Sequence, residues 1–405
     1  MSDNTLVPET VEQLGRVGRA DLVVGLCEGA GPDMAIEAIR ESISRFFPTS
    51  TAIVLVGEHA AQLAEAGDPR LCVVASRDWA TDPHTDSRPS RVLFHAAGTL
   101  GARACALLWA GEHPLDAADL RRLLAPALED DYDLVVPSFA RSPFDGLLNT
   151  SVLYPLMRAL FGQRVRWPAA PAFVVSGQLM LRAQTGELDD LVGNNDGLFI
   201  RLTTAAVAEQ RRVCQAEVSR RWPHQLHGDA AAAIAQTLSV AFDEIERRAI
   251  AWQRIRGSEP IPTTGAPLMV EPTDEPVDAA RLYESFALGY RNLQPVWSLV
   301  LSPASLLALK KRAAGFDATW RLTDDVWARI VYDFVVGYRL RVMSREHLLR
   351  SLAPIYLAWI ASYVLDVRSA SSASAEQRAE QLCRAFEAEK PYFVSRWRWP
   401  DRFSP

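Results

Sequence analysis

The chain has 405 residues, of which 49% are hydrophobic and 23% charged, and its formal net charge is −6, from 43 Lys and Arg against 49 Asp and Glu. This balance is typical of a soluble globular protein with a sizeable core, and it excludes the basic surface that binding to nucleic acid or anionic membrane requires. Because the length exceeds one ordinary domain of about 100–200 residues, we expect two domains or one large domain with an extension.

The first half of the chain alternates short apolar runs with helical patterns. Continuous apolar strands separated by helices are typical of a parallel sheet that is covered on both faces. Ligands of such α/β sheets bind at the carboxyl ends of the strands. The predicted strands are Asp21–Leu26, Ala52–Val56, Leu71–Ala75, Ala104–Trp109 and Asp133–Pro137, and the predicted helices between them are 33–47, 92–100 and 116–128.

From about Gly193 onwards the chain is predicted to be mostly helical. The segment 257–277 is rich in proline and has no sustained period, which favours a linker. We therefore expect an α/β domain over residues 1–256 and a helical domain over residues 278–405. The predicted helices are 230–252, 278–291, 302–314, 323–342, 345–364 and 375–388.

The cysteines and the N-terminus point to a cytoplasmic protein. The five cysteines lie far apart and form no CxxC pair, which argues against a structural zinc site or a disulfide framework. The first ten residues, MSDNTLVPET, have neither the basic nor the apolar region of a secretory signal. The longest apolar stretch, 352–365, contains Pro354 and is shorter than the about 20 residues of a membrane helix, so we expect no membrane span.

A glycine-containing segment, GAG at 29–31, follows the first predicted strand. A strand, such a loop and a helix together suit a dinucleotide site, in which Glu58 would bind a ribose hydroxyl. Met34 stands at the third glycine position, however, and Pro32 suits the first position of an ordinary helix. The segment is therefore either a cofactor loop or a plain strand-to-helix turn.

The tripeptide Gly-Glu-His occurs at 57–59 and again at 111–113. Each copy follows a predicted strand, so both copies should lie at the carboxyl edge of the sheet. Their Glu and His side chains could bind a transition metal or transfer protons, or they could be polar strand ends without a function. His224 and His227, within WPHQLH, leave the same two alternatives of metal ligands or solvated loop residues.

Polar and charged residues also follow the last predicted strand. A loop rich in Arg, Asp and Asn at a strand end can hold a polyhydroxylated or phosphorylated small molecule, because Arg binds phosphate or carboxylate in a bidentate way. The alternative is a capped helix start with surface arginines. The residues concerned are Arg141, Asp145, Asn149, Arg164 and Arg166.

Two tryptophans near the C-terminus, Trp397 and Trp399, are separated by one arginine. Such a pair could stack on a sugar or a nucleotide base. The other interpretation is that this aromatic-rich C-terminus packs into the body of the protein.

The stretch Asp131–Pro168, DYDLVVPSFARSPFDGLLNTSVLYPLMRALFGQRVRWP, resembles the signature of bacterial GT-A glycosyltransferases of the glucosyl-3-phosphoglycerate synthase and mannosylglycerate synthase type. Their pattern runs D-L-V-x-P-x-Y-x-R, Y-D-G-T-x-T-N, Y-P-L-x-R-A-L-Y-G and R-x-P. Phe139 and Phe161 replace tyrosines of this pattern, and Leu147 and Leu148 stand in its threonine-containing part. The similarity extends over nearly the whole chain, at 20–26, 92–128, 197–204, 326–366 and 386–397.

The resemblance implies a GT-A fold: a mixed, mainly parallel sheet with helices on both faces, followed by a helical C-terminal region. It also implies a nucleotide-sugar donor, a small acceptor of the glycerate or phosphoglycerate type, and Mn²⁺ or Mg²⁺ as cofactor. In this interpretation the substrate is bound by Arg141, Asp145, Asn149 and Arg166.

The chain departs from this family where the family performs its chemistry. The metal-binding D-x-D aligns with Trp109, Ala110 and Gly111, the G-G-D-F segment aligns with 170–173, and the G-I-D-I aspartate aligns with Phe199. A diphosphate leaving group needs its developing charge neutralised, so losing two metal ligands should cost roughly a thousandfold in rate.

Two functions from different classes remain. One is an atypical glycosyltransferase, in which Glu112, His113 and His224 offer replacement metal ligands or arginines bind the diphosphate without metal. The other is a catalytically inactive relative that binds a sugar nucleotide or regulates an active partner enzyme, as a homo-oligomer or together with an active paralogue. A nicotinamide oxidoreductase would rest on the glycine loop alone.

Overall fold

The computed structural model describes most of the chain between residues 8 and 400. The described ranges are 8–27, 41–43, 45–46, 51–56, 71–74, 88–109, 115–170, 172–184, 195–221, 229–268, 270, 277–368 and 370–400. The chain forms two compact units, here called the sheet unit and the helical unit. The sheet unit comprises 1–140, 165–221 and 261–268, and the helical unit comprises 141–164, 222–260 and 269–405.

The two units are interleaved along the chain, whereas the sequence predicted two contiguous domains joined by a linker at 257–277. Residues 141–164 and 222–260 belong to the helical unit, although the predicted α/β domain included them. Residues 261–268, expected within the linker, belong to the sheet unit. The division differs because hydrophobic periodicity identifies an element but not the elements on which it packs.

The sheet unit contains eight described strands and five described helices. The strands are β1 (Leu22–Cys27), β2 (Thr51–Val56), β3 (Leu71–Val74), β4 (Ala104–Trp109), β5 (Leu134–Ala140), β6 (Phe173–Ser176), β7 (Val213–Arg221) and β8 (Thr263–Thr264). The helices are α1 (Pro8–Val17), α4 (Arg88–Thr99), α5 (Ala117–Glu129), α7 (Gly177–Gln184) and α8 (Asn195–Ala208).

The sheet has the strand order β3-β2-β1-β4-β6-β5-β7-β8. Only β6, among the described strands, pairs antiparallel with its neighbours β4 and β5, and the other pairs are parallel. The chain is thus an α/β protein with a mixed, mainly parallel sheet, as expected. Each of the five strands predicted from apolar runs corresponds to a strand in the structure, although Asp21 and Asp133 precede β1 and β5.

Strands β6, β7 and β8 were not predicted. Strand β7 lies in the part of the chain that was expected to be mostly helical, yet it pairs with β5 along most of its length. Its sequence VCQAEVSRR alternates apolar and polar residues, which is the period-two pattern of a strand. This signal was present in the sequence, whereas β6 has only four residues and follows a proline-containing segment that obscured it.

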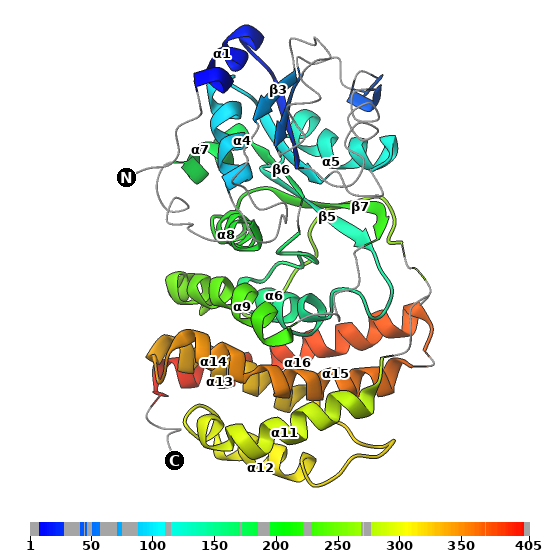
Figure 1. Ribbon diagram of the computed structural model, residues 1–405, viewed down its shortest axis with the longest axis vertical. Coiled ribbons are helices and arrows are strands. Elements are labelled where there is room, and N and C mark those ends of the chain that lie inside the picture. Colours follow the sequence, from blue (N-terminus) through cyan, green and yellow to red (C-terminus); the bar gives the residue numbers. More distant parts are fainter. Residues whose placement is uncertain are drawn as a thin grey trace. The chain divides into compact units, whose positions relative to one another are not determined.

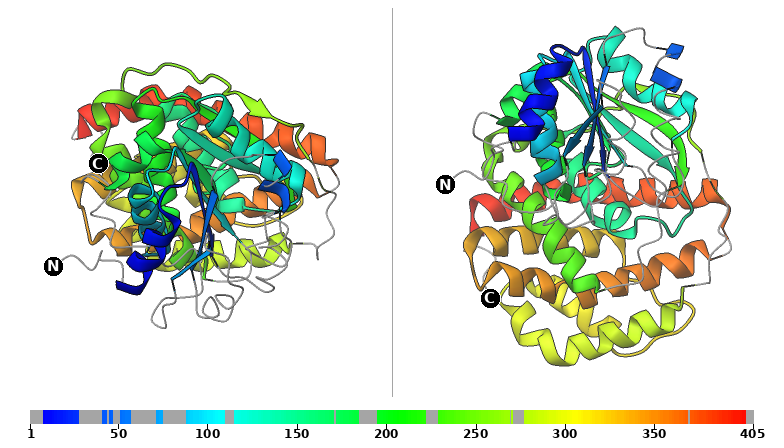
Figure 2. Two further views of the ribbon diagram at one scale, coloured as in Figure 1. Left: turned by 90° about the horizontal axis from the view of Figure 1, so that it is seen from above. Right: turned by 45° about the horizontal axis from the view of Figure 1, so that its top comes forward.

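Helices cover both faces of the sheet. Figures 1 and 2 show α4 and α7 on one face and α5 on the other. Helix α4 packs closely on β1 at Gly25, where an added Cβ would lie 2.5 Å from Cδ2 of Leu93. A larger residue at this position would therefore push α4 away from the sheet.

The helical unit is built from nine α-helices and one short π-helical turn within the described residues. Helix α11 packs along α15, and α16 packs along both α6 and α13 (Figure 1). The elements are η2 (Asn149–Leu153), α6 (Tyr154–Phe161), α9 (Ala230–Arg247), α10 (Ala249–Trp252), α11 (Ala279–Ser298), α12 (Pro303–Arg312), α13 (Asp324–Leu340), α14 (Arg345–Ser351), α15 (Ala353–Val367) and α16 (Ser372–Arg398).

Polar caps explain where several of these helices begin. A side-chain oxygen of the capping residue accepts hydrogen bonds from the first-turn N–H groups, which have no partner within the helix. The capping residues are Asp229, Asp278, Ser302, Ser344 and Ser371.

One apolar stretch of the described residues, 345–367, is long enough to cross a membrane by length and composition. In its most apolar window, 78% of the residues are buried inside the protein, as expected for a core helix. Pro354 lies in the first turn of α15, just after α14 ends at Ser351. The stretch is thus two helices packed in the core of the helical unit, and its composition is no argument for a membrane span.

Candidate functional site

The carboxyl ends of β2, β1 and β4 lie side by side. In the parallel register, Cys27 at the end of β1 is paired with Val56 of β2 on one side and with Trp109 of β4 on the other. The chain continues from β1 to β2 and β3 on one side and then crosses to β4 on the other. In α/β sheets a ligand crevice forms where the strand order reverses in this way.

Most of the polar segments singled out in the sequence follow these three strand ends. The GAG segment follows β1, and the two Gly-Glu-His tripeptides follow β2 and β4. These segments, with Glu112 and His113, lie outside the described residues, as do His224 and His227. Neighbouring strands are about 5 Å apart, so the tripeptides leave the sheet edge from strand ends separated by about 10 Å.

The described residues offer no metal site of their own. No group of three or more His, Cys, Asp and Glu side chains that could hold a metal ion occurs among them. The last residue of β4 is Trp109, whose indole offers no oxygen ligand for a divalent ion. The described residues therefore do not fit a divalent ion, and the predicted ligands belong to the other part of the chain.

A buried carboxylate joins the start of α5 to the carboxyl end of β7. Asp116 caps α5 by accepting from the backbone N–H of Asp119 at 2.7 Å. The Asp119 side chain is fully buried and accepts from the backbone N–H of Ser219 at 3.0 Å, from the Ser219 hydroxyl and from Nη1 of Arg122 at 2.6 Å. Sequence reasoning missed this role, although two aspartates three residues apart at a helix start are a capping signal.

Two of the predicted substrate-binding residues, Arg141 and Asp145, lie in one buried turn that follows β5. Asp145 accepts from the backbone N–H of Ser142 at 2.7 Å, and its own N–H donates to the carbonyl of Ser142 at 3.2 Å. Asp145 thus closes the turn through both its side chain and its backbone. Nη2 of Arg141 lies 2.7 Å from Oε2 of Glu376 in α16.

The other two predicted residues lie elsewhere. Asn149 begins the π-helical turn η2, and such single turns are frequent at functional sites. Arg166 belongs to the sheet unit, where its backbone N–H donates to Oε1 of Gln215 at 2.5 Å. Arg141, Asp145 and Asn149 belong to the helical unit. The structure therefore brings Arg141 and Asp145 together and divides the predicted set between the two units.

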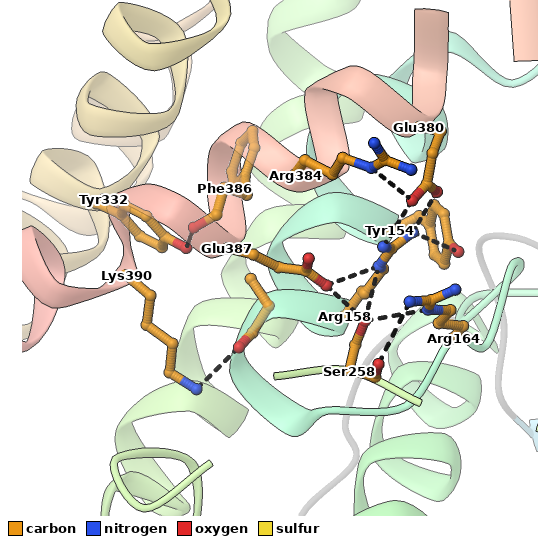
Figure 3. A network of polar contacts seen from close by, with 11 residues as sticks. Tyr154, Arg158, Arg164, Ser258, Tyr332, Glu380, Arg384, Phe386, Glu387 and Lys390 are labelled. Atoms are coloured by element: carbon orange, nitrogen blue, oxygen red, sulfur yellow. Dashed lines mark hydrogen bonds and ion pairs between the residues drawn. The ribbon is translucent and has the colours of Figure 1, made fainter. Parts of the chain in front are cut away.

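Sequence reasoning also missed a buried charge network around Arg158 (Figure 3). The Arg158 side chain is 1% exposed, and its Nη1 and Nη2 donate to the two carboxylate oxygens of Glu380 at 2.5 and 2.9 Å. Its Nε donates to Glu387 at 2.9 Å and to Ser258 at 3.0 Å. Arg164 donates to the same Ser258 hydroxyl at 3.1 Å. The network joins α6, the segment after α10, and α16 within the helical unit.

Lys390 lies at the end of the same helix pair and satisfies the last carbonyls of α6. Its Nζ donates to the carbonyls of Ala159 at 2.8 Å and Leu160 at 3.2 Å. Gly162 follows with φ of 75°, where an added Cβ would lie 2.6 Å from Ile255. Burial lowers the pKa of the Lys390 ammonium to about 8 from its ordinary 10.5.

The lowered pKa of Lys390 predicts a pH-dependent stability. Between pH 8 and 10.5 the unfolded chain binds more protons at this residue than the folded chain, so the stability rises with pH. Lys390→Met removes this titration. The quantity to follow is the free energy of unfolding of the wild type minus that of Lys390→Met. This difference should increase by about 2–3 kcal/mol as the pH rises through that window. Urea unfolding at several pH values would measure it, and a pH-independent difference would contradict the assignment.

Of the two tryptophans near the C-terminus, one packs into the helical unit and the other is exposed. Trp397 is 6% exposed and contacts Trp252 and Phe393 edge-on, with ring centroids 5.2 and 5.6 Å apart. Trp399 is 57% exposed. The two rings therefore do not form a shared stacking platform for a ligand.

The chain matches no protein-family model and no curated protein. Among solved structures it is similar to glucosyl-3-phosphoglycerate synthase from Mycobacterium tuberculosis in complex with Mn²⁺, UDP-glucose and phosphoglyceric acid, with a TM-score of 0.40 and 16% identity over 59% of this chain and 84% of that chain. The same enzyme with Mg²⁺ and UDP gives a TM-score of 0.40 and 17% identity over 59% and 83%. A mycobacterial protein gives 0.38 and 15% over 58% and 78%. Likenesses of this size support no conclusion about the ligands of this chain.

Proposed function

We propose that this chain is a glycosyltransferase-like protein of the GT-A type, which binds a nucleotide sugar at the carboxyl edge of its sheet. The reaction is transfer of the sugar to a small acceptor of the glycerate or phosphoglycerate type. The observation that carries this proposal is the reversal of strand order at β1 and β4, from whose carboxyl ends the polar segments continue. A nucleotide diphosphate needs such a crevice, open on one side and lined by loops.

The acceptor side of the proposal rests on the residues after β5. The stretch Asp131–Pro168 carries the sequence resemblance, and it places Arg141, Asp145 and Asn149 in one short segment. Arg141 supplies a guanidinium suited to the carboxylate or phosphate of such an acceptor. Asp145 fixes the turn that holds Arg141, so its part in binding is to position that residue.

The donor diphosphate requires positive charge in its neighbourhood. We propose that Mn²⁺ or Mg²⁺ supplies it, held by Glu112, His113 and His224 in place of the missing aspartates. Carboxylate and imidazole groups are suitable ligands for Mn²⁺. In the competing arrangement, arginine side chains bind the diphosphate and no metal is needed. The two arrangements can be distinguished because donor binding depends on Mn²⁺ or Mg²⁺ only in the first.

Addition of UDP-glucose together with Mn²⁺ is expected to raise the melting temperature. At a hundredfold excess over the dissociation constant the gain should be about 3 °C or more. The Glu112→Ala/His113→Ala variant should lose this gain. A matched control, His95→Ala/Glu129→Ala, removes one exposed His and one exposed Glu elsewhere in the sheet unit and should keep it.

The outcomes separate the mechanisms. A gain that UDP-glucose gives equally without Mn²⁺ would refute the metal and favour the arginine arrangement. Equal gains in the wild type and in Glu112→Ala/His113→Ala would remove these two residues from the site. The absence of a gain with UDP-, GDP- and ADP-linked sugars, with or without metal, would refute nucleotide-sugar binding.

A second candidate function is favoured by Trp109 at the position of a metal-binding aspartate. It is a catalytically inactive relative that binds a sugar nucleotide and regulates an active partner, which could be a paralogue or a second copy of this chain. A coupled assay for release of UDP in the presence of 3-phosphoglycerate distinguishes the two. Donor binding without UDP release would favour the regulatory protein, which we also propose, like the enzyme, to be cytoplasmic.

A further inference from the structure

We propose that Glu376 is an internal competitor for the anionic ligand of Arg141: its carboxylate occupies the guanidinium that the acceptor carboxylate or phosphate would otherwise bind. This inference rests on the proposed function and adds a regulatory residue to it. The competing ligand class is a small phosphate- or carboxylate-bearing molecule.

The backbone of the helical unit holds the two residues opposite each other. The carbonyl of Arg141 accepts from the N–H of Val270 at 3.1 Å. The carbonyl of Val270 accepts from the hydroxyl of Ser372 at 3.3 Å, in the first turn of α16. Glu376 follows Ser372 by four residues and therefore lies above it on the same side of the helix. The carboxylate is thus brought to Arg141 by the fold rather than by a long flexible segment.

The two partners differ in their exposure, which decides which one can move. The side chain of Arg141 is 9% exposed, and that of Glu376 is 43% exposed. A half-exposed glutamate retains much of its hydration, so breaking its ion pair costs less than breaking that of a buried carboxylate. The backbone next to the buried Arg141 is fixed by a turn that Asp145 closes in both directions. An incoming anion would therefore displace Glu376 and leave Arg141 in place.

The charges explain why such a pair favours one class of ligand. A carboxylate at 2.7 Å from Nη2 is the geometry that a bound acceptor carboxylate or phosphate oxygen would adopt. A ligand must both replace this intramolecular contact and approach the negative charge of the displaced glutamate. A dianionic phosphate can replace the ion pair where a neutral sugar cannot, because its attraction to the guanidinium is stronger, but its repulsion from the displaced glutamate lowers the affinity. Arg141 therefore selects for charged acceptors while Glu376 limits their affinity.

Inorganic phosphate is the simplest probe of this inference. Its affinity for the full chain can be measured by isothermal titration calorimetry at low ionic strength. Glu376→Gln keeps the shape of the side chain and removes the charge, so phosphate should bind about fivefold more tightly or better than to the wild type. Arg141→Gln/Glu376→Gln should lose that gain, because the guanidinium is absent.

A matched control uses another ion pair of the same helix. Glu389 of α16 pairs with Arg329 at 2.7 Å and lies outside the turn of Arg141. Glu389→Gln also removes one negative charge, and it should leave the phosphate affinity unchanged. A similar gain in Glu389→Gln would show that net charge alone is responsible and would overturn the inference. Glu376→Ala provides a second variant if Glu376→Gln does not fold.

The test separates this inference from the proposed function. Equal phosphate affinity in the wild type and Glu376→Gln, or a gain that persists without Arg141, would overturn the competitor role. Such a result would leave donor binding untouched, because the UDP-glucose measurement with Mn²⁺ does not depend on Glu376. Conversely, a gain in Glu376→Gln with 3-phosphoglycerate as well as with phosphate would support the acceptor class even if the metal proposal fails.

Discussion

Replacement of Arg158 by alanine is expected to lower the free energy of unfolding by about 3–5 kcal/mol. Breaking a buried ion pair by removing one partner usually costs this much. Here the loss comes from the contacts of one buried guanidinium with two carboxylates, which are themselves 34% and 23% exposed. Arg158 is 1% exposed and binds the carboxylates of Glu380 and Glu387 together with the Ser258 hydroxyl. Urea unfolding followed by tryptophan fluorescence would measure the loss.

A matched control for this variant is Arg384→Ala. Arg384 also donates to Glu380, at 3.3 Å, but it is 72% exposed. Exposed pairs within a helix are worth about 0.5 kcal/mol or less, so Arg384→Ala should be close to neutral. Comparable losses in both variants would mean that burial does not set the cost, and would contradict the role given to Arg158.

The Arg158 network also predicts a pH dependence. Hydrogen bonding from Arg158 holds the pKa of Glu380 below its ordinary value of 4.5. A depressed carboxylate pKa stabilises the folded state above the unfolded pKa, and the effect is lost as pH falls through the folded pKa. The difference in stability between wild type and Arg158→Ala should therefore be largest near neutral pH and shrink in acid. A difference that grows below pH 4.5 would contradict it.

The sheet could be predicted from the sequence because its buried strands are continuous apolar runs. The runs ending at Val56 and Trp109 correspond to β2 and β4. Strand β6, inserted antiparallel between β4 and β5, could not be predicted because strand order is a tertiary property. The interleaving of the two units could not be predicted for the same reason, since α6 carries a single charge and its other residues suit either a sheet or a helical environment.

The candidate site could be predicted only in part. Residue type and position after a strand predicted Arg141 and Asp145 as binding residues. The structure places them in one turn, and their binding role stays a prediction. The same reasoning could not find Glu376, which lies 235 residues later in the chain than Arg141. Arg158 was missed because it stands within YPLMRALF, where a single charge looks like an exposed position on an apolar helix. Its carboxylate partners come from α16, and no local sequence pattern predicts a contact between residues so far apart in the chain.

Replacement of Asp119 by alanine is the second variant for which we expect a large effect, about 3 kcal/mol of unfolding free energy. The fully buried carboxylate accepts from the backbone N–H and hydroxyl of Ser219 and from Arg122. Alanine would remove all of these hydrogen bonds to a carboxylate, each worth about 1.5–3 kcal/mol. Ser219 is exposed and the Arg122 side chain is 35% exposed, so water can replace part of the loss and the total stays near the value of a single such bond. Thermal and urea unfolding would measure the loss.

Asp116→Ala is the control, because Asp116 belongs to the same helix start but serves only as its cap. A lost N-cap costs about 1 kcal/mol, so a loss in Asp119→Ala no larger than this would refute the role of Asp119 in joining α5 to β7. A double-mutant cycle with Ser219→Ala adds a direct test, since residues in contact should show a coupling energy of at least about 0.5 kcal/mol.

The carboxyl end of β7 and the start of α5 both lie at the sheet edge where the ligand is proposed to bind. Asp119→Ala should therefore also weaken the stabilisation by UDP-glucose.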